Sequence, residues 1–136
     1  LDQYLADWLA AGAYLNARRV AEGREIADRA LAQIAAGGAR QYEADLHRLK
    51  GEFTLMAGED LGDAEAAFNS AIAIARRQQA RGFELRASLS LARVLAQQGR
   101  RDEARATLAG IYNWFTEGFD TADLKDAKAL LEELIT

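Results

Sequence analysis

The sequence GEDLGDAEAAFNSA at residues 58–71 has a close counterpart in GRRDEARATLAGI at residues 99–111. Each segment begins with a glycine and a charged turn and continues into alanine-rich sequence. A fainter copy starts at Gly23, and the interval from Gly23 to Ala64 is nearly the same as that from Ala64 to Ala104. A repeat of about 40 residues without strand signals predicts stacked helix pairs, in which each pair covers the apolar face of its neighbour.

The amino-acid composition favours helix throughout. The 136 residues include 30 alanines and 18 leucines, whereas valine and isoleucine together number 8. Alanine and leucine lose little conformational entropy in a helix, while β-branched residues are the usual strand formers. Proline, which interrupts helices, is absent from the sequence. We therefore predict an all-α fold in one domain.

Hydrophobic periodicity and the positions of the glycines predict seven helices. The first six form three antiparallel units at residues 2–38, 40–80 and 82–117, and a last helix at 121–135 caps the stack. The expected helices cover residues 2–15, 19–36, 40–57, a segment that follows the turn at 58–62 and ends near 79, then 83–98, 102–115 and 121–135. Residues 1–136 then form a single repeat domain. Because the chain opens with Leu1 and Asp2 and no methionine, we expect it to be part of a larger protein.

The spacing of small and large residues inside these units resembles the tetratricopeptide repeat. In the second helix of a unit, a small residue is followed after four positions by a large one and after three more by another core residue. The positions are Ala64, Phe68 and Ala71, then Ala104, Leu108 and Ile111, and a first helix offers Leu46, Leu49 and Phe53. The resemblance implies an α-α superhelix of three antiparallel helix pairs plus a C-terminal capping helix, with helices longer than those of the usual 34-residue unit.

Four segments extend the resemblance to the C-terminal region of bacterial multidomain signalling proteins. In those proteins an adenylate/guanylate cyclase-like or DNA-binding domain and a signal-transduction ATPase precede tetratricopeptide-like repeats. The segments are EADLHRLKGE at 43–52, AIAIARRQ at 71–78, ELRASLSLAR at 84–93 and WFTEGFDTADLK at 114–125. Two features depart from the pattern. Arg18 stands near the place of an expected turn glycine, and the metal-binding aspartates of cyclases and the phosphate loop of ATPases are missing.

Reactive side chains are scarce in this sequence. His47 is the only histidine and there is no cysteine, so the three or four ligands of a typical zinc site are not at hand. No glycine-rich phosphate-binding motif is present. We expect no catalytic residue, no metal site and no cofactor in this chain. An enzyme or small-ligand binder built in a helical cavity is therefore the least favoured class.

Charge and hydropathy argue against two further kinds of partner. The net charge is −4, and the arginine pairs at 18–19, 76–77 and 100–101 lie close to acidic residues, whereas nucleic-acid modules carry a basic stripe. The sequence has neither an apolar run long enough to span a membrane nor a basic-then-apolar leader. We therefore expect no nucleic-acid binding, no membrane binding and a cytoplasmic location.

The inner face of the stack is the predicted binding surface. If the apolar stripe at positions 46, 49 and 53 corresponds to positions 88, 91 and 95, the groove side of the two helices can be read from the sequence. It presents five candidate residues: His47, Lys50, Arg86, Leu89 and Arg93. A wall with several cations favours an acidic peptide or a carboxylate group.

Aromatic residues near the two ends of the chain are candidates for exposed contacts. Trp114 and Phe119 flank Gly118, and Trp8 lies in the first helix. Aromatic side chains at helix ends most often pack in the core, and the alternative is that one ring stays exposed and docks a partner.

Two functions remain open on the sequence alone. The first is a non-catalytic protein- or peptide-binding repeat module, which forms the regulatory C-terminal part of a bacterial cyclase/ATPase-type signalling protein. Its partner would be another protein, a peptide or another domain of the same parent chain. The alternative is a self-association element that forms a homodimer through its exposed first and last helices.

Overall fold

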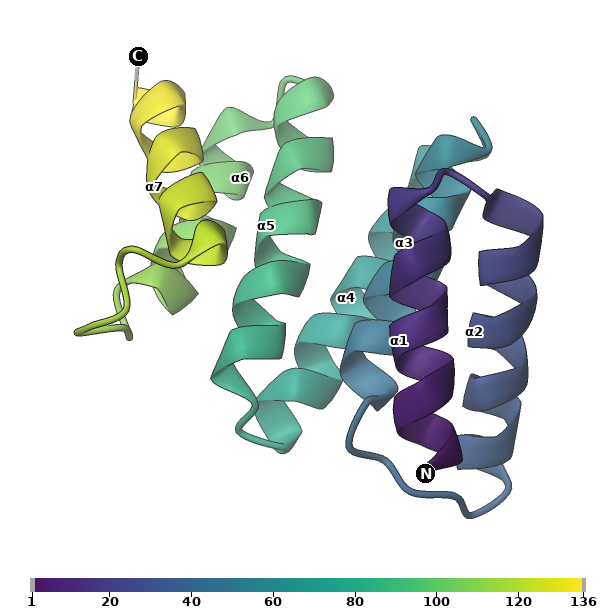
Figure 1. The fold of residues 1–136 in the computed structure, drawn as a ribbon. Helices are drawn as coiled ribbons and strands as arrows, with labels where there is room; N and C mark the ends of the chain where they lie inside the picture. Colours follow the sequence, from purple (N-terminus) through teal and green to yellow (C-terminus); the bar gives the residue numbers. More distant parts are fainter. Residues whose placement is uncertain (1, 136) are drawn as a thin grey trace.

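The computed structural model describes residues 2–135, and this part of the chain is all-helical, with seven α-helices and no strand (Figure 1). The helices are α1 (Gln3–Asn16), α2 (Val20–Ala35), α3 (Glu43–Met56), α4 (Leu61–Arg77), α5 (Arg81–Gln97), α6 (Arg101–Tyr112) and α7 (Ala122–Ile135). The predicted all-α fold is thereby confirmed.

Two helix boundaries differ by three residues from those expected from the sequence, and the others agree to within one or two residues. Helix α3 begins at Glu43, whose amide donates a turn hydrogen bond to the carbonyl of Arg40, so residues 40–42 precede the helix. Helix α6 ends at Tyr112 and not at residue 115. The amides of Trp114 and Phe115 each donate to the carbonyl three residues earlier, a tighter pattern that closes the last turn.

The turns inside the helix pairs repeat along the chain. Arg18, Gly58 and Gly99 all have a positive φ, of 59°, 70° and 78°, and nearly equal stretches of sequence separate them. This left-handed conformation suits glycine and costs a residue with a Cβ atom about 1–2 kcal/mol. Arg18 therefore occupies the position that glycine holds in the other two pairs, and the same backbone turn forms despite its side chain.

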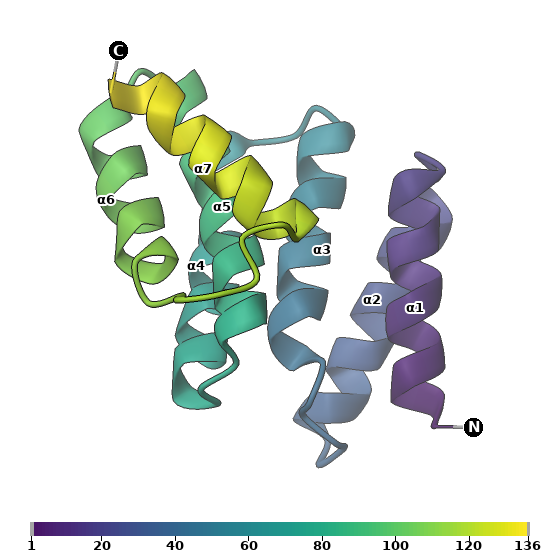
Figure 2. The same ribbon diagram turned by 60° about the vertical axis from the view of Figure 1, so that its left-hand side comes forward.

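The helices pack in the order of the sequence (Figures 1 and 2). Each helix contacts the next one along the chain, and both views place α1 and α2 at one end of the row and α6 and α7 at the other. The odd-numbered helices also contact one another, α1 with α3, α3 with α5 and α5 with α7. Within residues 2–135, by contrast, no Cα atom of α2 lies within 8 Å of one in α4, and the same holds for α4 and α6.

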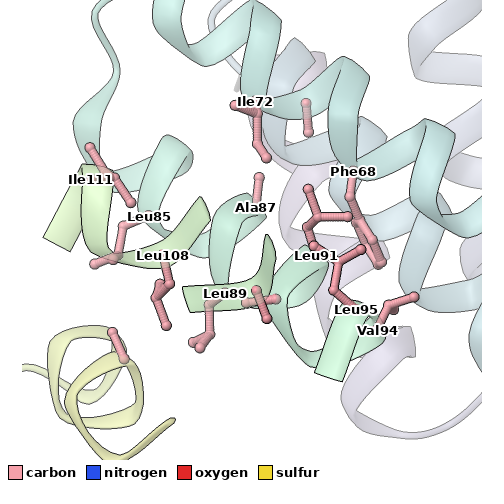
Figure 3. Close-up of a cluster of buried hydrophobic side chains, with 14 of the residues drawn as sticks. Phe68, Ile72, Leu85, Ala87, Leu89, Leu91, Val94, Leu95, Leu108 and Ile111 are labelled. Carbon is pink, nitrogen blue, oxygen red and sulfur yellow. The ribbon is translucent and has the colours of Figure 1, made fainter. Parts of the chain in front are cut away.

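Two large clusters of apolar side chains hold the row together. The first joins α4, α5, α6 and α7, and Figure 3 draws some of its side chains, among them Phe68, Leu91 and Leu108. The second joins α1, α2 and α3 around Phe53. The rings of Phe53 and Phe68 lie directly against glycines of a neighbouring helix, Gly23 and Gly51, where a Cβ atom would come within 2.2 Å and 2.5 Å of ring carbons. Small residues therefore set the distance between these helices.

Candidate binding groove

A groove of about 620 Å³ runs along the odd-numbered helices, with lining residues from α1, α3, α5 and α7. Its size lies within the range of about 300–1,000 Å³ that is usual for ligand sites. Four of its apolar lining residues are leucines, namely Leu9, Leu15, Leu49 and Leu89. Seven others are charged: Asp45, Arg48, Glu52, Arg86, Arg93, Asp123 and Asp126.

Asp45 is the centre of the polar network in this groove. Its side chain is 2% exposed and accepts hydrogen bonds from Trp8 Nε1 at 2.7 Å and from Arg48 Nε at 2.6 Å. A terminal nitrogen of Arg86 lies 3.7 Å from its Oδ2 atom. One carboxylate thus links α1, α3 and α5, because its three partners come one from each of these helices.

The indole of Trp8 is fixed by two further aromatic rings. It stacks on Tyr42 with 4.7 Å between ring centroids and meets Phe83 edge-on at 5.9 Å. The sequence leaves open whether Trp8 forms an exposed contact. In the structure its ring is half-buried, and its Nε1 atom is committed to Asp45.

The environment of Asp45 favours its ionised form. Burial by itself raises the pKa of a carboxyl group, but here the charge of Arg48, the hydrogen bonds from Arg48 and Trp8 and the charge of Arg86 act in the opposite direction. Together they outweigh burial and hold the pKa of Asp45 below its usual 3.8. The network is therefore a charged one under neutral conditions.

The two arginines of α5 that line the groove face carboxylates from α7. Arg86 Nε donates to Asp123 Oδ2 at 2.9 Å, and a terminal nitrogen of Arg93 lies 3.8 Å from Asp126 Oδ2. The two arginines are about two helical turns apart and the two aspartates about one turn apart, and both pairs form because α7 packs against α5. The last helix thus supplies counter-charges to the groove.

The charge of the groove differs from the cationic wall that the sequence suggests. Its three arginines, Arg48, Arg86 and Arg93, are set against four carboxylates, those of Asp45, Glu52, Asp123 and Asp126. The surface is therefore of mixed charge, with a slight excess of negative groups. An acidic ligand would have to displace carboxylates that already pair with Arg86 and Arg93.

The structure divides the five predicted groove residues between two surfaces. Arg86, Leu89 and Arg93 line the groove, whereas His47 and Lys50 line a separate cavity of about 440 Å³ formed by α2, α3, α4 and the turn before α4. The physical reason is helical register. Matching positions 46, 49 and 53 with 88, 91 and 95 uses an interval one residue longer than the interval between the equivalent turns at Gly58 and Gly99. A shift of one residue rotates a helix face by about 100°.

The residues that replace His47 and Lys50 in the groove were not predicted. Asp45, Arg48 and Glu52 come from α3, and Asp123 and Asp126 come from α7. Asp45 and Arg48 stand between apolar residues at helical spacing, but an exposed pair on a helix has the same appearance in sequence. Their burial depends on α1 and α5, which belong to the preceding and the following helix pair and are distant in sequence.

The second cavity surrounds His47 with charged residues. Arg24 of α2 donates two hydrogen bonds of 3.0 Å to the carboxylate of Glu59, and Lys50 Nζ lies 3.1 Å from Asp28 Oδ1. Burial, the largest influence, lowers the pKa of His47 below its usual 6.5; Glu43 acts against this shift and Lys50 adds to it.

We expect the pKa of His47 to lie below 6.5 in the folded protein. As the only histidine, it gives a single set of ring resonances that NMR can follow against pH. The unfolded chain then binds a proton at higher pH than the folded chain, so the free energy of unfolding should fall as pH drops from 6.5 toward the folded pKa. Lys50→Gln should move the pKa upward. A pKa at or above 6.5 in the unmodified protein would contradict the burial seen here.

The two other candidate aromatic residues lie beyond the groove, in the segment between α6 and α7. Trp114 is 56% exposed and Phe119 is 45% exposed. Trp114 packs edge-on against Phe115 and under the guanidinium of Arg81, 5.2 Å from its ring centroid, while Phe119 lies 5.9 Å from Tyr112. Both rings are thus partly covered by intramolecular contacts.

The chain is thus an all-α protein in which consecutive helices pack against each other and a charged groove runs along the odd-numbered helices. Comparison with protein-family models, curated proteins and solved structures gives no match for this chain. Among residues 2–135 there is no cluster of three or more His, Asp or Glu side chains placed to hold a metal ion. No helix in the same range has the length and apolar character needed to cross a membrane.

Proposed function

We propose that this chain is a tetratricopeptide-like α-α superhelix that binds a protein or peptide in the groove lined by α1, α3, α5 and α7. The observation that carries the proposal is the contact pattern. Successive first helices of the pairs touch one another, whereas the second helices α2, α4 and α6 stay apart. A row built in this way curves toward its first helices, and repeat proteins use such concave surfaces to bind extended partners.

The contents of the groove support a peptide-like partner over a substrate. Leucine side chains provide apolar contact area, and charged side chains of both signs line the same groove. Such a surface selects partners by electrostatic complementarity and by the register of side chains. No pair of groove residues has the arrangement of nucleophile and base that covalent catalysis requires, so we propose a binding function without turnover.

The proposal also covers the parent protein to which this module belongs. The segments at 43–52, 71–78, 84–93 and 114–125 support placing the module in the cytoplasm as the regulatory C-terminal part of a bacterial cyclase/ATPase-type signalling protein. Its groove partner would then be another protein or another domain of the parent chain.

Arg93 is the residue on which the groove can be tested without disturbing the fold. Its side chain is 51% exposed and its contact with Asp126 is long, at 3.8 Å. Arg86 is unsuitable, because a glutamate there would face Asp45, which is 2% exposed, and would lose the pairing with Asp123. Arg105 of α6 is a matched control, since it is 45% exposed and pairs with Asp102 away from the groove.

We expect Arg93→Glu to change the affinity of groove-binding peptides by about three- to tenfold, because reversing one exposed charge changes an interaction by roughly 1 kcal/mol. Peptides that place a carboxylate at Arg93 should lose affinity, and peptides that place a cation there should gain it. Peptides selected from a random displayed library against the immobilised protein would serve as probes, with affinities measured by fluorescence anisotropy. Arg105→Glu should leave those affinities unchanged. Equal loss in both variants, or selected peptides that bind both as well as the unmodified protein, would contradict binding in this groove.

A further inference from the structure

The outward face of α1 is unusually apolar for an exposed helix. Among residues 3–16 the only charged residue is Asp7, and its side chain is buried at 4% exposure. Leu9, by contrast, is 57% exposed. Surface helices normally carry polar residues opposite their core face, and a helix that is apolar on all sides is normally covered on all sides.

The repeat shows which positions of α3 and α5 are equivalent to this face. Ala11, Gly51 and Ala92 are buried small residues on the three first helices. They are separated by the same intervals as the three residues with positive φ that end these helices, at positions 18, 58 and 99. The three small residues therefore define one register, and every other residue of α1 is matched to α3 and α5 by counting from them.

The positions equivalent to the outward face of α1 are buried in both other helices. Leu9 corresponds to Leu49, which is 1% exposed, and to Ser90, which is 4% exposed. The flanking positions behave alike: Ala6 corresponds to Leu46 and Ala87, and Ala13 corresponds to Phe53 and Val94, all four of them 0% or 1% exposed. In α1, Ala6 is half-buried and Ala13 is exposed. The same face is therefore covered in α3 and α5 and open in α1.

The structure also shows what covers this face in α3 and α5. Helix α3 contacts both α1 and α2, and α5 contacts both α3 and α4, so in each case the cover is the preceding antiparallel hairpin. The second helix of that hairpin contributes small residues to the interface, as where Phe53 of α3 packs against Gly23 of α2.

From this equivalence we infer that the outward face of α1 is a docking surface for a helical hairpin. The hairpin lies on α1 as α3 and α4 lie on α5. Of the two hairpins seen here, the one that covers α5 is the better match at two of the three positions, because Ala87 and Val94 are closer in size to Ala6 and Ala13 than are Leu46 and Phe53. At the third position Leu9 is identical to Leu49 and larger than Ser90. Leu9 and Ala13 also line the α1 end of the groove, so a docked hairpin would cover that end. The inference does not depend on whether the groove binds a peptide.

A fusion protein tests the inference with a hairpin of known shape. Residues 40–81 are joined ahead of residue 1 of the complete chain, so that residue 1 takes the place that Gly82 has after Arg81. Leu9 then lies where Ser90 lies relative to the added hairpin. Leu9→Glu is made in the original chain and in the fusion, and thermal unfolding is followed by circular dichroism.

The expected result is a large difference between the two backgrounds. In the original chain Leu9→Glu should lower the unfolding midpoint by less than about 2 °C, because exposed substitutions have small effects. In the fusion it should lower the midpoint by about 5–15 °C, because the leucine is then buried. Leu61→Glu in the original copy is the control, since Leu61 is a 39% exposed leucine on α4, and its effect should be small in both proteins.

Three outcomes would overturn the inference. The first is an equally small effect of Leu9→Glu in both backgrounds. The second is a fusion that unfolds in two separate transitions, one of them at the midpoint of the original chain, because the hairpin would then not be docked. The third is a dimer of the original chain, detected by sedimentation velocity, that Leu9→Glu dissociates, because a second copy would then be the occupant of this face.

Discussion

Asp45→Ala should lower the free energy of unfolding by about 3–5 kcal/mol, the cost of removing one partner from a buried ion pair. The carboxylate of Asp45 neutralises Arg48, which is 16% exposed, and accepts a hydrogen bond from the indole N–H group of Trp8. Without it, the largely buried guanidinium of Arg48 and the half-buried N–H group of Trp8 lose their acceptor. Urea denaturation followed by circular dichroism at neutral pH measures the change.

Asp126→Ala is the matched control for this prediction. Asp126 lies in the same groove, but its side chain is 57% exposed and its ion pair with Arg93 is 3.8 Å long. Its loss should cost about 0–1 kcal/mol. Equal effects of the two substitutions would show that the network around Asp45 is not buried as described.

The effect of Asp45→Ala should also depend on pH. Because the folded-state pKa of Asp45 lies below 3.8, its contribution is fully present above that value and is lost as pH falls through the folded-state pKa. The difference in stability between the unmodified protein and the alanine variant should therefore shrink in acid. A difference that stays constant from neutral to strongly acidic conditions would contradict a charged network.

Gly51→Ala should destabilise the protein by about 1–3 kcal/mol, the usual cost of overpacking a core. A Cβ atom on Gly51 would lie 2.5 Å from Cε1 and 2.8 Å from Cδ1 of Phe68, which is 0% exposed. The sign of this effect is informative, because replacing glycine with alanine inside a helix otherwise stabilises by about 0.5–1 kcal/mol.

Gly110→Ala provides the comparison. Gly110 lies inside α6, and a Cβ atom there would meet nothing within 4 Å, so this variant should gain the helical preference of alanine. Adding Phe68→Leu to Gly51→Ala should lower the cost of the alanine, because the smaller side chain makes room for its methyl group. If Gly51→Ala stabilises the protein as Gly110→Ala does, α3 and α4 are not as close as the structure has them.

The helices and their consecutive packing could be predicted because their determinants are local. Alanine and leucine dominate the segments, glycine stands at the turns, and both helices of a pair recur at the same interval. Even Arg18, which lacks the freedom of glycine, forms the expected turn with a φ of 59°. The neighbouring helices determine this turn because they fix where both of its ends lie.

The binding surface could be predicted only in part because it depends on register and on tertiary pairing. Arg86 and Arg93 reach the groove, but their carboxylate partners Asp123 and Asp126 lie on α7, and no local pattern links residues so distant in the sequence. His47 and Lys50 fall on the same predicted surface only if α3 and α5 are matched with an interval that is one residue too long. A shift of one residue along a helix rotates the side chains by about 100°, which places them on a different face.

The groove reaches from α1 to α7, although these two helices have no contact with each other within residues 2–135. A long ligand would therefore bridge parts of the chain that can otherwise fray separately, as the ends of linear repeat arrays do. Amide hydrogens in α1 and α7 should then exchange more slowly in its presence, while those in the middle of the row change less. Such a ligand would act as a tie between the two ends and would stiffen the whole array.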